Sequence, residues 1–318
     1  MQHPYTGLLA LIGACTIWGL SPVFYKLLVH VPPSELLAHR TVWSLVIFTA
    51  LLALQGRLGA LRAALSRATV GRILTAALLV SCNWFLFIYA IQIDRTTEAS
   101  LGYYIFPLVS VMLGVLVLGE RLSRPQILAV GLAALAVLIL SVGLGAPPWI
   151  SLILATTFGL YGLIKKRLPV GPVVSVTAEV TMLSPIALAW LVWLHHAGGA
   201  GGVFGAGDPA TSALLILSGL LTALPLILFS YASQRASMAT VGLVQYLNPT
   251  LQFFCAVVLF GEPFGLLHAV TFGLIWTALA IYSAAHLGHD RARRRAAKAS
   301  STLPTEVTKP KSEASAKP

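Results

Sequence analysis

Charged residues are scarce in this sequence. They make up 10% of its 318 residues, while hydrophobic residues make up 57%. Soluble domains carry about 25% charged residues, and a chain this apolar has too few polar side chains to cover a surface in water. The composition therefore excludes a soluble domain and predicts an integral membrane protein.

The motifs of several enzyme classes are also missing. The sequence contains no G-x-x-x-x-G-K-[ST] phosphate loop, no H-E-x-x-H zinc motif and no Asp-rich metal motif. Its cysteines, Cys15, Cys82 and Cys255, fall inside apolar stretches without the spacing of metal ligands, so we interpret them as packing residues. We expect a protein that is not an enzyme and that holds no cofactor and no metal.

Long apolar runs dominate what is present. A membrane-spanning helix needs about 20 mostly apolar residues, and the sequence has ten such stretches. We therefore predict an all-α integral membrane protein with ten transmembrane helices. Their expected ranges are 7–28, 35–54, 72–93, 97–118, 125–143, 149–165, 172–194, 212–233, 239–260 and 265–286.

Basic residues gather on one side of this arrangement. With the N-terminus in the cytoplasm, ten Lys and Arg fall in inside loops and eight in the C-terminal tail, which is 18 of the 21 in the chain. This bias predicts a multi-pass membrane protein with cytoplasmic N- and C-termini. It also accounts for the net charge of +11 without a nucleic-acid partner, because the basic tail faces anionic membrane lipid.

The second half of the chain repeats the first. Residues 81–120 align with residues 223–262 without a gap. With five spans in each half, the second half enters the membrane upside down, which is a signature of secondary transporters. The predicted units are a first five-helix repeat over 1–144, a second, inverted repeat over 147–286, and a disordered basic cytoplasmic tail over 287–318.

The second predicted span opens with a polar cluster. Glu35 and His39 lie four residues apart on one helix face, and Arg40 follows. Because histidine titrates near neutral pH, Glu35 and His39 are candidates for substrate contact or proton coupling. The alternative is an outer-end cluster that satisfies itself or a loop carbonyl. Lys26, near the same surface, is interpreted as an interfacial lysine.

Spans four and nine each carry a proline, Pro107 and Pro249. A mid-span proline removes a backbone hydrogen bond and kinks the helix. Span nine adds Gln245, Asn248 and Gln252, whose spacing places them in one polar stripe. We interpret the stripe as the lining of a cavity, and the alternative is hydrogen bonding between helices.

Other polar side chains lie singly within the predicted spans. Asn83 needs a partner, which is either a ligand or a neighbouring helix. Glu179 is a lone carboxylate that is either protonated or paired, and we expect it to be functional and a further candidate for proton coupling. Trp18 lies mid-span in a duplicated motif and is a candidate cavity residue. The triplet Lys165-Lys166-Arg167 is interpreted as a topology determinant.

Three carboxylates near helix ends have structural interpretations. Glu98 either has a functional role or forms a salt bridge with Arg95 at the outer surface, and these two alternatives stay open. Glu120 and Glu262 are expected to serve helix-end turns.

The chain resembles the drug/metabolite transporter superfamily, specifically the EamA-type RarD proteins of bacterial inner membranes, over residues 5–286. The motifs that carry the resemblance are Ile17-Trp18-Gly19-Leu20, Glu35 to Arg40, Asn83-Trp84, Glu98 to Tyr103, Phe158 to Gly162 and Gln245 to Phe253. The resemblance implies a ten-span carrier of two inverted repeats, with a central cavity lined by spans one to four and six to nine. One departure is Phe106, where the family pattern leads us to expect Asn, as at Asn248.

We therefore predict a secondary transporter that moves small organic metabolites or drugs across the bacterial inner membrane by alternating access. The alternatives are a passive channel or facilitator for small metabolites and, less favoured because the acids are scattered, a membrane-embedded lipid or isoprenoid transferase. The substrate, the direction, the energy coupling and the choice between monomer and homodimer stay open. The predicted cavity residues are Trp18, His39, Arg40, Asn83, Tyr103, Tyr161, Glu179, Gln245, Asn248 and Gln252.

Overall fold

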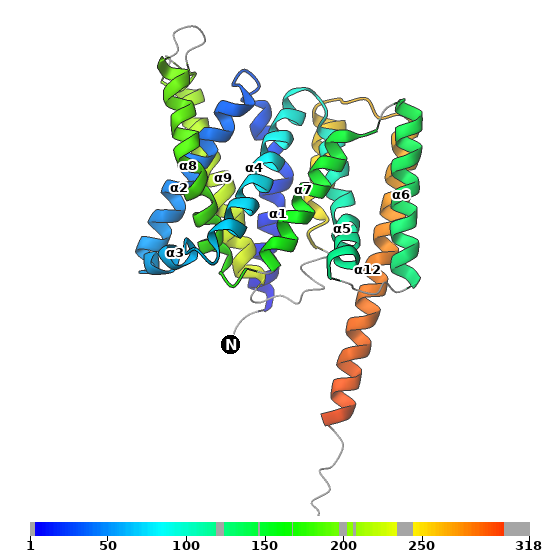
Figure 1. The fold of residues 1–318 in the computed structure, drawn as a ribbon. Coiled ribbons are helices and arrows are strands. Elements are labelled where there is room, and N and C mark those ends of the chain that lie inside the picture. The colour runs from blue at the N-terminus through cyan, green and yellow to red at the C-terminus, as the bar shows by residue number, and fades with distance from the viewer. Residues whose placement is uncertain are drawn as a thin grey trace, which may run out of the picture.

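The computed structural model describes most of the chain as a bundle of helices (Figure 1). The described residues are 4–118, 124–145, 147–166, 168–196, 202–205, 208–233 and 244–301. Within them the backbone forms helices, turns and loops, and no strand occurs. The predicted Gly119-Glu120 helix end and the basic residue Arg235 lie outside these ranges.

The helices follow the predicted apolar stretches closely. Many of their boundaries have a local cause: α2, α8 and α9 begin at a proline, a residue suited to the first helical turn. Gly56 and Gly145, with φ of 64° and 68°, follow the ends of α2 and α6 and adopt the left-handed conformation that ends helices. The bounds are α1 Pro4–Lys26, α2 Pro33–Leu54, α3 Leu58–Ala64, α4 Val70–Gln92, α5 Thr96–Leu118, α6 Arg124–Leu144, α7 Trp149–Lys166, α8 Pro172–His196, α9 Pro209–Ser233, α11 Leu247–Phe254, the π-helix η1 Cys255–Leu259, and α12 Leu266–Ser301.

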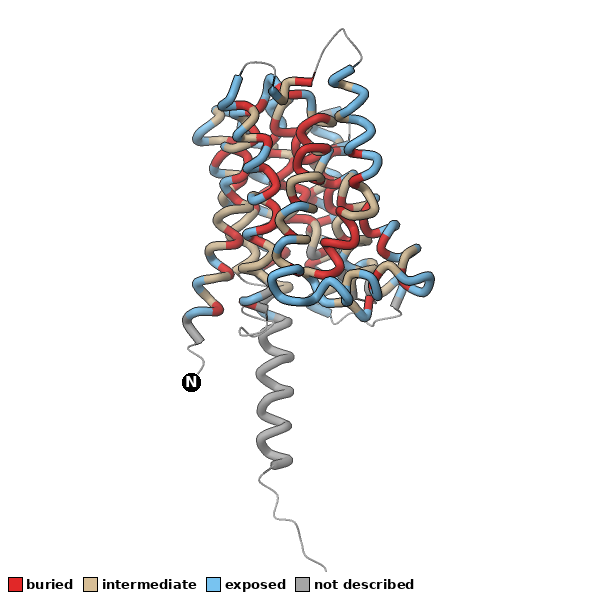
Figure 2. The backbone as a smooth tube through the Cα atoms, turned by 90° about the vertical axis from the view of Figure 1, so that its left-hand side faces the viewer, coloured by how far each residue is buried: buried red, intermediate tan, exposed pale blue. Residues whose placement is uncertain are grey.

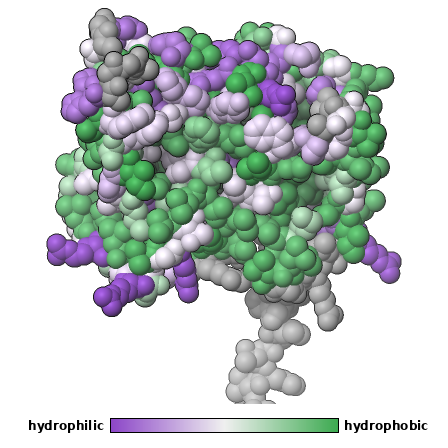
Figure 3. Space-filling model, turned by 45° about the horizontal axis from the view of Figure 1, so that its top comes forward, coloured by the Kyte–Doolittle hydropathy of each residue, from purple (hydrophilic) through white to green (hydrophobic). Residues whose placement is uncertain are grey.

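Six of these helices are long and apolar enough to cross a membrane by length and composition: α1, α2, α4, α6, α8 and α9. Shorter apolar segments lie in α7, in α11 with η1, and in α12. Hydrophobic side chains cover the flank of the molecule, while hydrophilic ones gather at its upper end and lower rim (Figure 3). This distribution is that of a membrane protein with an apolar belt.

Neighbouring helices in space are often distant in sequence. α1 packs against α9 and α11, α7 packs against α4 and α5, and α2 packs against α8 and α9. α6 and α12 pack together at one side of the bundle (Figure 1). Buried residues concentrate along its centre (Figure 2), and one apolar cluster joins α1, α2, α4, α5, α7 and α9.

Small residues set how closely two of these helices approach. A Cβ added at Gly219 of α9 would lie 2.5 Å from Cβ of Trp43 in α2 and 2.6 Å from its carbonyl carbon. No side chain larger than hydrogen fits there, so Gly219 fixes the spacing of α2 and α9.

Two segments differ from the sequence expectation. Span nine is interrupted by a turn at Gln245 and Tyr246, and α11 starts at Leu247. Pro249 therefore lies in the first turn of a new helix, where its missing N–H breaks no intrahelical bond, rather than at a mid-helix kink. Pro107 lies in α5, and its side chain is outside the described set.

The last helix also extends beyond its expected range. The backbone of α12 is helical to Ser301 and includes the basic segment 289–295, which we had assigned to a disordered tail. Alanine and arginine, which are strong helix formers, dominate that segment and favour the continuation. Residues 302–318 lie outside the described ranges.

Candidate functional site

Arg40 lies at the centre of a polar cluster built from both halves of the chain. Its Nε donates to Oγ1 of Thr222 at 2.6 Å, and its Nη1 donates to the hydroxyl of Tyr25 at 2.7 Å. Its guanidinium carbon lies 4.1 Å from the ring centroid of Trp84, a cation–π distance. The four side chains come from α1, α2, α4 and α9, so Arg40, a predicted cavity residue, contacts side chains from both halves of the chain.

Glu35 and His39 join α2 to the segment between α8 and α9 that contains Val203 and Phe204. Glu35 is 2% exposed and accepts the backbone N–H of Val203 at 2.7 Å. His39 Nε2 lies 4.0 Å from Glu35 Oε1 and makes no hydrogen bond to the described residues, while its ring packs against Phe204 with centroids 4.8 Å apart. Glu35 therefore accepts a hydrogen bond from a loop N–H group. The structural alternative from the sequence was a cluster whose members pair with one another or with a loop carbonyl.

Asn83 and Tyr103 form a second polar contact. The Tyr103 hydroxyl donates to Oδ1 of Asn83 at 2.8 Å. The amide nitrogen of Asn83 donates to the Leu154 carbonyl at 2.9 Å and to Oγ1 of Thr157 at 3.0 Å. Asn83 is fully buried, and these bonds use three of its four hydrogen-bonding positions. The partners of Asn83 are therefore neighbouring helices, α5 and α7, and two predicted cavity residues, Asn83 and Tyr103, contact each other.

Glu179 is paired rather than isolated. Lys165 Nζ lies 2.6 Å from Oε1 of Glu179, Ser175 donates to the same oxygen at 2.9 Å, and Tyr161 donates to Oε2 at 3.2 Å. Glu179 is 1% exposed, so this set replaces the water that the carboxylate loses. Tyr161 and Glu179 were both predicted site residues. Lys165 was missed, because its place in a basic triplet suggested a topology role.

A chain of aromatic rings connects these clusters. Ring centroids are 6.0 Å apart between Tyr25 and Phe87, 5.6 Å between Phe87 and Tyr103, 5.9 Å between Tyr103 and Phe158, and 5.8 Å between Phe158 and Tyr161. It runs from the partner of Arg40 to the partner of Glu179 through α1, α4, α5 and α7. Aromatic rings, among them Tyr103 with its hydrogen bond to Asn83, therefore link the Arg40 cluster to the Glu179 cluster.

The stripe on α11 forms its own contacts. Gln252 Nε2 donates to Oδ1 of Asn248 at 2.9 Å, while its buried Oε1 accepts no hydrogen bond from the described residues. Trp18 contacts Phe229, with ring centroids 5.9 Å apart. No hydrogen bond, ion pair or ring contact among the described residues joins Trp18, Gln245, Asn248 or Gln252 to Arg40 or Glu179.

Ionic contacts near helix ends have structural roles. Glu262 accepts the backbone N–H groups of Thr96 and Thr97, each at 2.7 Å, and so caps the N-terminus of α5. Arg95 and Glu98 form an ion pair at 3.3 Å, as the salt-bridge alternative predicts. Lys26 pairs with Asp94, a partner that sequence reasoning did not identify.

The carboxylate of Asp208 caps the start of α9. Asp208 accepts the hydroxyl of Thr211 and the backbone N–H of Ala210, the latter at 3.0 Å. These hydrogen bonds stabilise the charged carboxylate and so lower the pKa of Asp208. The bond from Thr211 has the largest effect and the bond from Ala210 the next largest.

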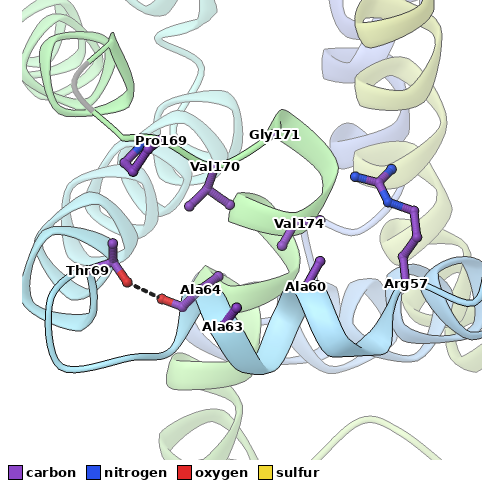
Figure 4. Close-up of a pocket in the computed structure, with 9 residues that line it drawn as sticks. All are labelled: Arg57, Ala60, Ala63, Ala64, Thr69, Pro169, Val170, Gly171 and Val174. Carbon is purple, nitrogen blue, oxygen red and sulfur yellow. Dashed lines mark hydrogen bonds between the residues drawn. The ribbon is translucent and has the colours of Figure 1, made fainter.

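A surface pocket lies at the opposite end of the bundle. It is bounded by α3, the α3–α4 turn and the start of α8, with Val170 and Val174 on one side and Arg57 apart on the other (Figure 4). Ala60 and Ala64 complete a mainly apolar wall. None of the predicted cavity residues lines it.

Sequence comparison now decides the family. Residues 5–142 match the EamA-like transporter family. Protein RarD of Streptomyces exfoliatus is 44% identical over 96% of this chain and 96% of its own length. The chain belongs to the RarD family of EamA-like transporters. Protein RarD of Escherichia coli is 37% identical over 87% of this chain and 93% of the relative. The chloramphenicol-sensitive protein RarD of Pseudomonas aeruginosa is 31% identical over 91% and 97%.

A solved structure shares the fold. It superposes on 88% of this chain and 97% of its own length with a TM-score of 0.58 and 17% sequence identity. Family and helices together make the chain a multi-pass membrane transporter.

Proposed function

We propose that this transporter is a ten-span secondary carrier that moves small organic metabolites or drugs across the bacterial inner membrane by alternating access. The observation that carries the proposal is a symmetry in the helix contacts. Pairing α1 with α7, α2 with α8, α4 with α9, α5 with α11 and α6 with α12 relates the two halves.

Under this pairing the most extensive helix contacts have counterparts. The contact α1–α9 corresponds to α7–α4, α1–α11 corresponds to α7–α5, and α2–α9 corresponds to α8–α4. The contacts α2–α8 and α6–α12 correspond to themselves. Such a pattern is expected of two repeats related by a pseudo-two-fold axis, and it supports the inverted duplication inferred from sequence.

The polar clusters line the proposed substrate pathway. Arg40 and the pair Lys165–Glu179 are buried in helices that stem from different halves, and aromatic rings lie between them. Charged groups inside membrane helices mark substrate and ion pathways. In the proposal the two halves rock around this region, which is exposed first to one side of the membrane and then to the other.

The basic residues orient the carrier. Arg62 lies in α3 and Arg57 directly precedes it. This helix lies at the same end of the bundle as the N-terminus and the extension of α12 (Figure 1). The positive-inside rule assigns this end to the cytoplasm. Both termini are therefore proposed to be cytoplasmic.

Transport is tested in vesicles with a defined probe. Purified protein in liposomes containing unlabelled bacterial metabolite extract is placed in uniformly ¹³C-labelled extract, and mass spectrometry identifies the labelled compounds that enter. We expect a limited set of small organic compounds to enter protein-containing vesicles and not protein-free ones. Equal entry into both would contradict the proposal.

Proton coupling is a separate part of the proposal, assigned to Glu35, His39 and Glu179. An imposed pH gradient is expected to stimulate uptake by the wild type. The variants Glu35→Gln, His39→Asn and Glu179→Gln are tested singly. We expect at least one of them to lose the stimulation by the pH gradient. Unchanged stimulation in all three would remove this part while leaving transport intact.

A further inference from the structure

Arg40 is a buried cation at a depth where charge is costly. Its side chain is 5% exposed. It lies seven residues after Pro33, the first residue of α2, which is about 10 Å along the helix. Arginine keeps its proton in proteins, so it cannot escape this cost by becoming neutral. A charge at this depth needs a compensating partner.

No carboxylate in the described part of the chain compensates Arg40. Glu35, one and a half turns earlier, is held by the N–H of Val203 and lies near His39. The four ion pairs among the described residues are Lys26–Asp94, His39–Glu35, Arg95–Glu98 and Lys165–Glu179. Arg40 therefore has no carboxylate in ion-pair contact among the described residues.

The guanidinium also has spare donors. Of its five N–H groups, the described bonds use one on Nε, to Thr222, and one on Nη1, to Tyr25. Nη2 donates to no group in the described ranges. Trp84 covers one face of the guanidinium. The side chain is thus held in one orientation while part of its hydrogen-bonding edge remains available.

We propose that Arg40 binds the carboxylate of a monoanionic organic substrate whose apolar body packs against the surrounding aromatic rings. The proposal rests on the transport function proposed above and specifies its substrate class. A carboxylate matches the planar donor edge of a guanidinium and supplies one negative charge. Tyr25, Trp84 and Phe87 provide the aromatic surface.

Charge balance selects this class over two others. A neutral compound would leave the Arg40 guanidinium without an ionic contact, and a phosphate dianion would bring two negative charges to one guanidinium. Lys165, a partly exposed cation in the proposed pathway, is already paired with Glu179. A single carboxylate matches the one charge of the guanidinium and so limits the cost of holding that charge at membrane depth.

The labelled extract tests this class directly. We expect the compounds that enter wild-type vesicles to carry one carboxylate and a net charge of minus one. Benzoate is expected to inhibit their entry, whereas benzamide, a neutral molecule of the same shape, and phenyl phosphate are not. Entry of mainly neutral or cationic compounds, or equal inhibition by benzamide or phenyl phosphate, would overturn the anion proposal and leave the transport function standing. Absence of any entry would instead contradict the transport function.

Variants at position 40 complete the test. Arg40→Met is expected to reduce entry of the monocarboxylates at least about 30-fold, the loss typical of removing one partner of a buried charge pair. Arg95→Met, which removes an exposed arginine at the outer surface, is the matched control and is expected to retain entry and benzoate inhibition. Wild-type entry by a folded Arg40→Met protein would overturn the proposal.

A second variant covers a failure of Arg40→Met to fold. Arg40→Lys keeps the charge and loses the planar edge, so benzoate is expected to inhibit about 10-fold more weakly while remaining better than benzamide. Benzoate inhibition as strong as in the wild type would overturn the assignment, because a purely structural arginine has no effect on anion selectivity.

Discussion

The pair Lys165–Glu179 allows a quantitative prediction about stability. At the observed 2.6 Å, the Coulomb attraction between the two groups is about 6 kcal/mol at an effective dielectric constant of about 20. Most of this attraction offsets the cost of removing both charges from water. Loss of one partner leaves the other charge buried, which typically costs 3–5 kcal/mol, so we place this pair near about 3 kcal/mol because the Lys165 side chain is 20% exposed.

A double-mutant cycle measures this prediction. Lys165→Met and Glu179→Met are each expected to lower the free energy of unfolding by about 3 kcal/mol, and the double variant by about 1 kcal/mol, because it leaves no unpaired charge. The measurement is reversible unfolding in mixed detergent micelles, followed by circular dichroism. Arg95→Met breaks an exposed pair, in which the arginine is 48% exposed, and is the control, with an expected cost below about 1 kcal/mol.

Two results would refute the reasoning about this pair. One is a cost for the single variants as small as that of Arg95→Met. The other is a double variant whose cost equals the sum of the two single costs, because independent sites add in this way.

Three further predictions concern packing and caps. Gly219→Ala is expected to destabilise the protein by about 1–3 kcal/mol through collision with Trp43, whereas Gly131→Ala, with nothing within 4 Å of the added Cβ, is expected to be neutral or stabilising in thermal unfolding. Glu262→Ala is expected to cost about 1–2 kcal/mol in the same assay, because two α5 amides lose their acceptor, and no change in melting temperature would contradict the cap. The lowered pKa of Asp208 means that its cap stabilises the protein above the ordinary value of 3.8 and loses its effect as the pH falls through the lowered value. The melting-temperature difference between wild type and Asp208→Ala is therefore expected to be constant near neutral pH and to shrink in that acid range.

The helices could be predicted from hydrophobic runs, because a membrane span must satisfy its own backbone hydrogen bonds. The predicted starts of α7 and α8 agree with the structure to the residue. The break at Gln245 and Tyr246 was missed, because a proline predicts a disturbance of the helix but does not distinguish a kink from a restart.

Partners across helices were harder to predict than site residues. Arg40 stood out as a charge in an apolar stretch, but Thr222 and Tyr25 have common positions in such stretches and gave no sign of meeting it. Lys165 was not recognised as a site residue, because its place in a basic triplet was already explained by membrane topology. A polar residue within a span predicts that a partner exists, while tertiary packing decides which one.

The account's central claim is that the chain is a carrier, and trans-stimulation tests it most directly. Vesicles containing the protein are preloaded with a compound found to enter them, or left empty, and the initial entry of the same compound in labelled form is measured. A carrier that alternates between two faces exchanges faster than it returns empty, so we expect faster entry into the preloaded vesicles. Equal initial rates would contradict alternating access and favour a passive channel.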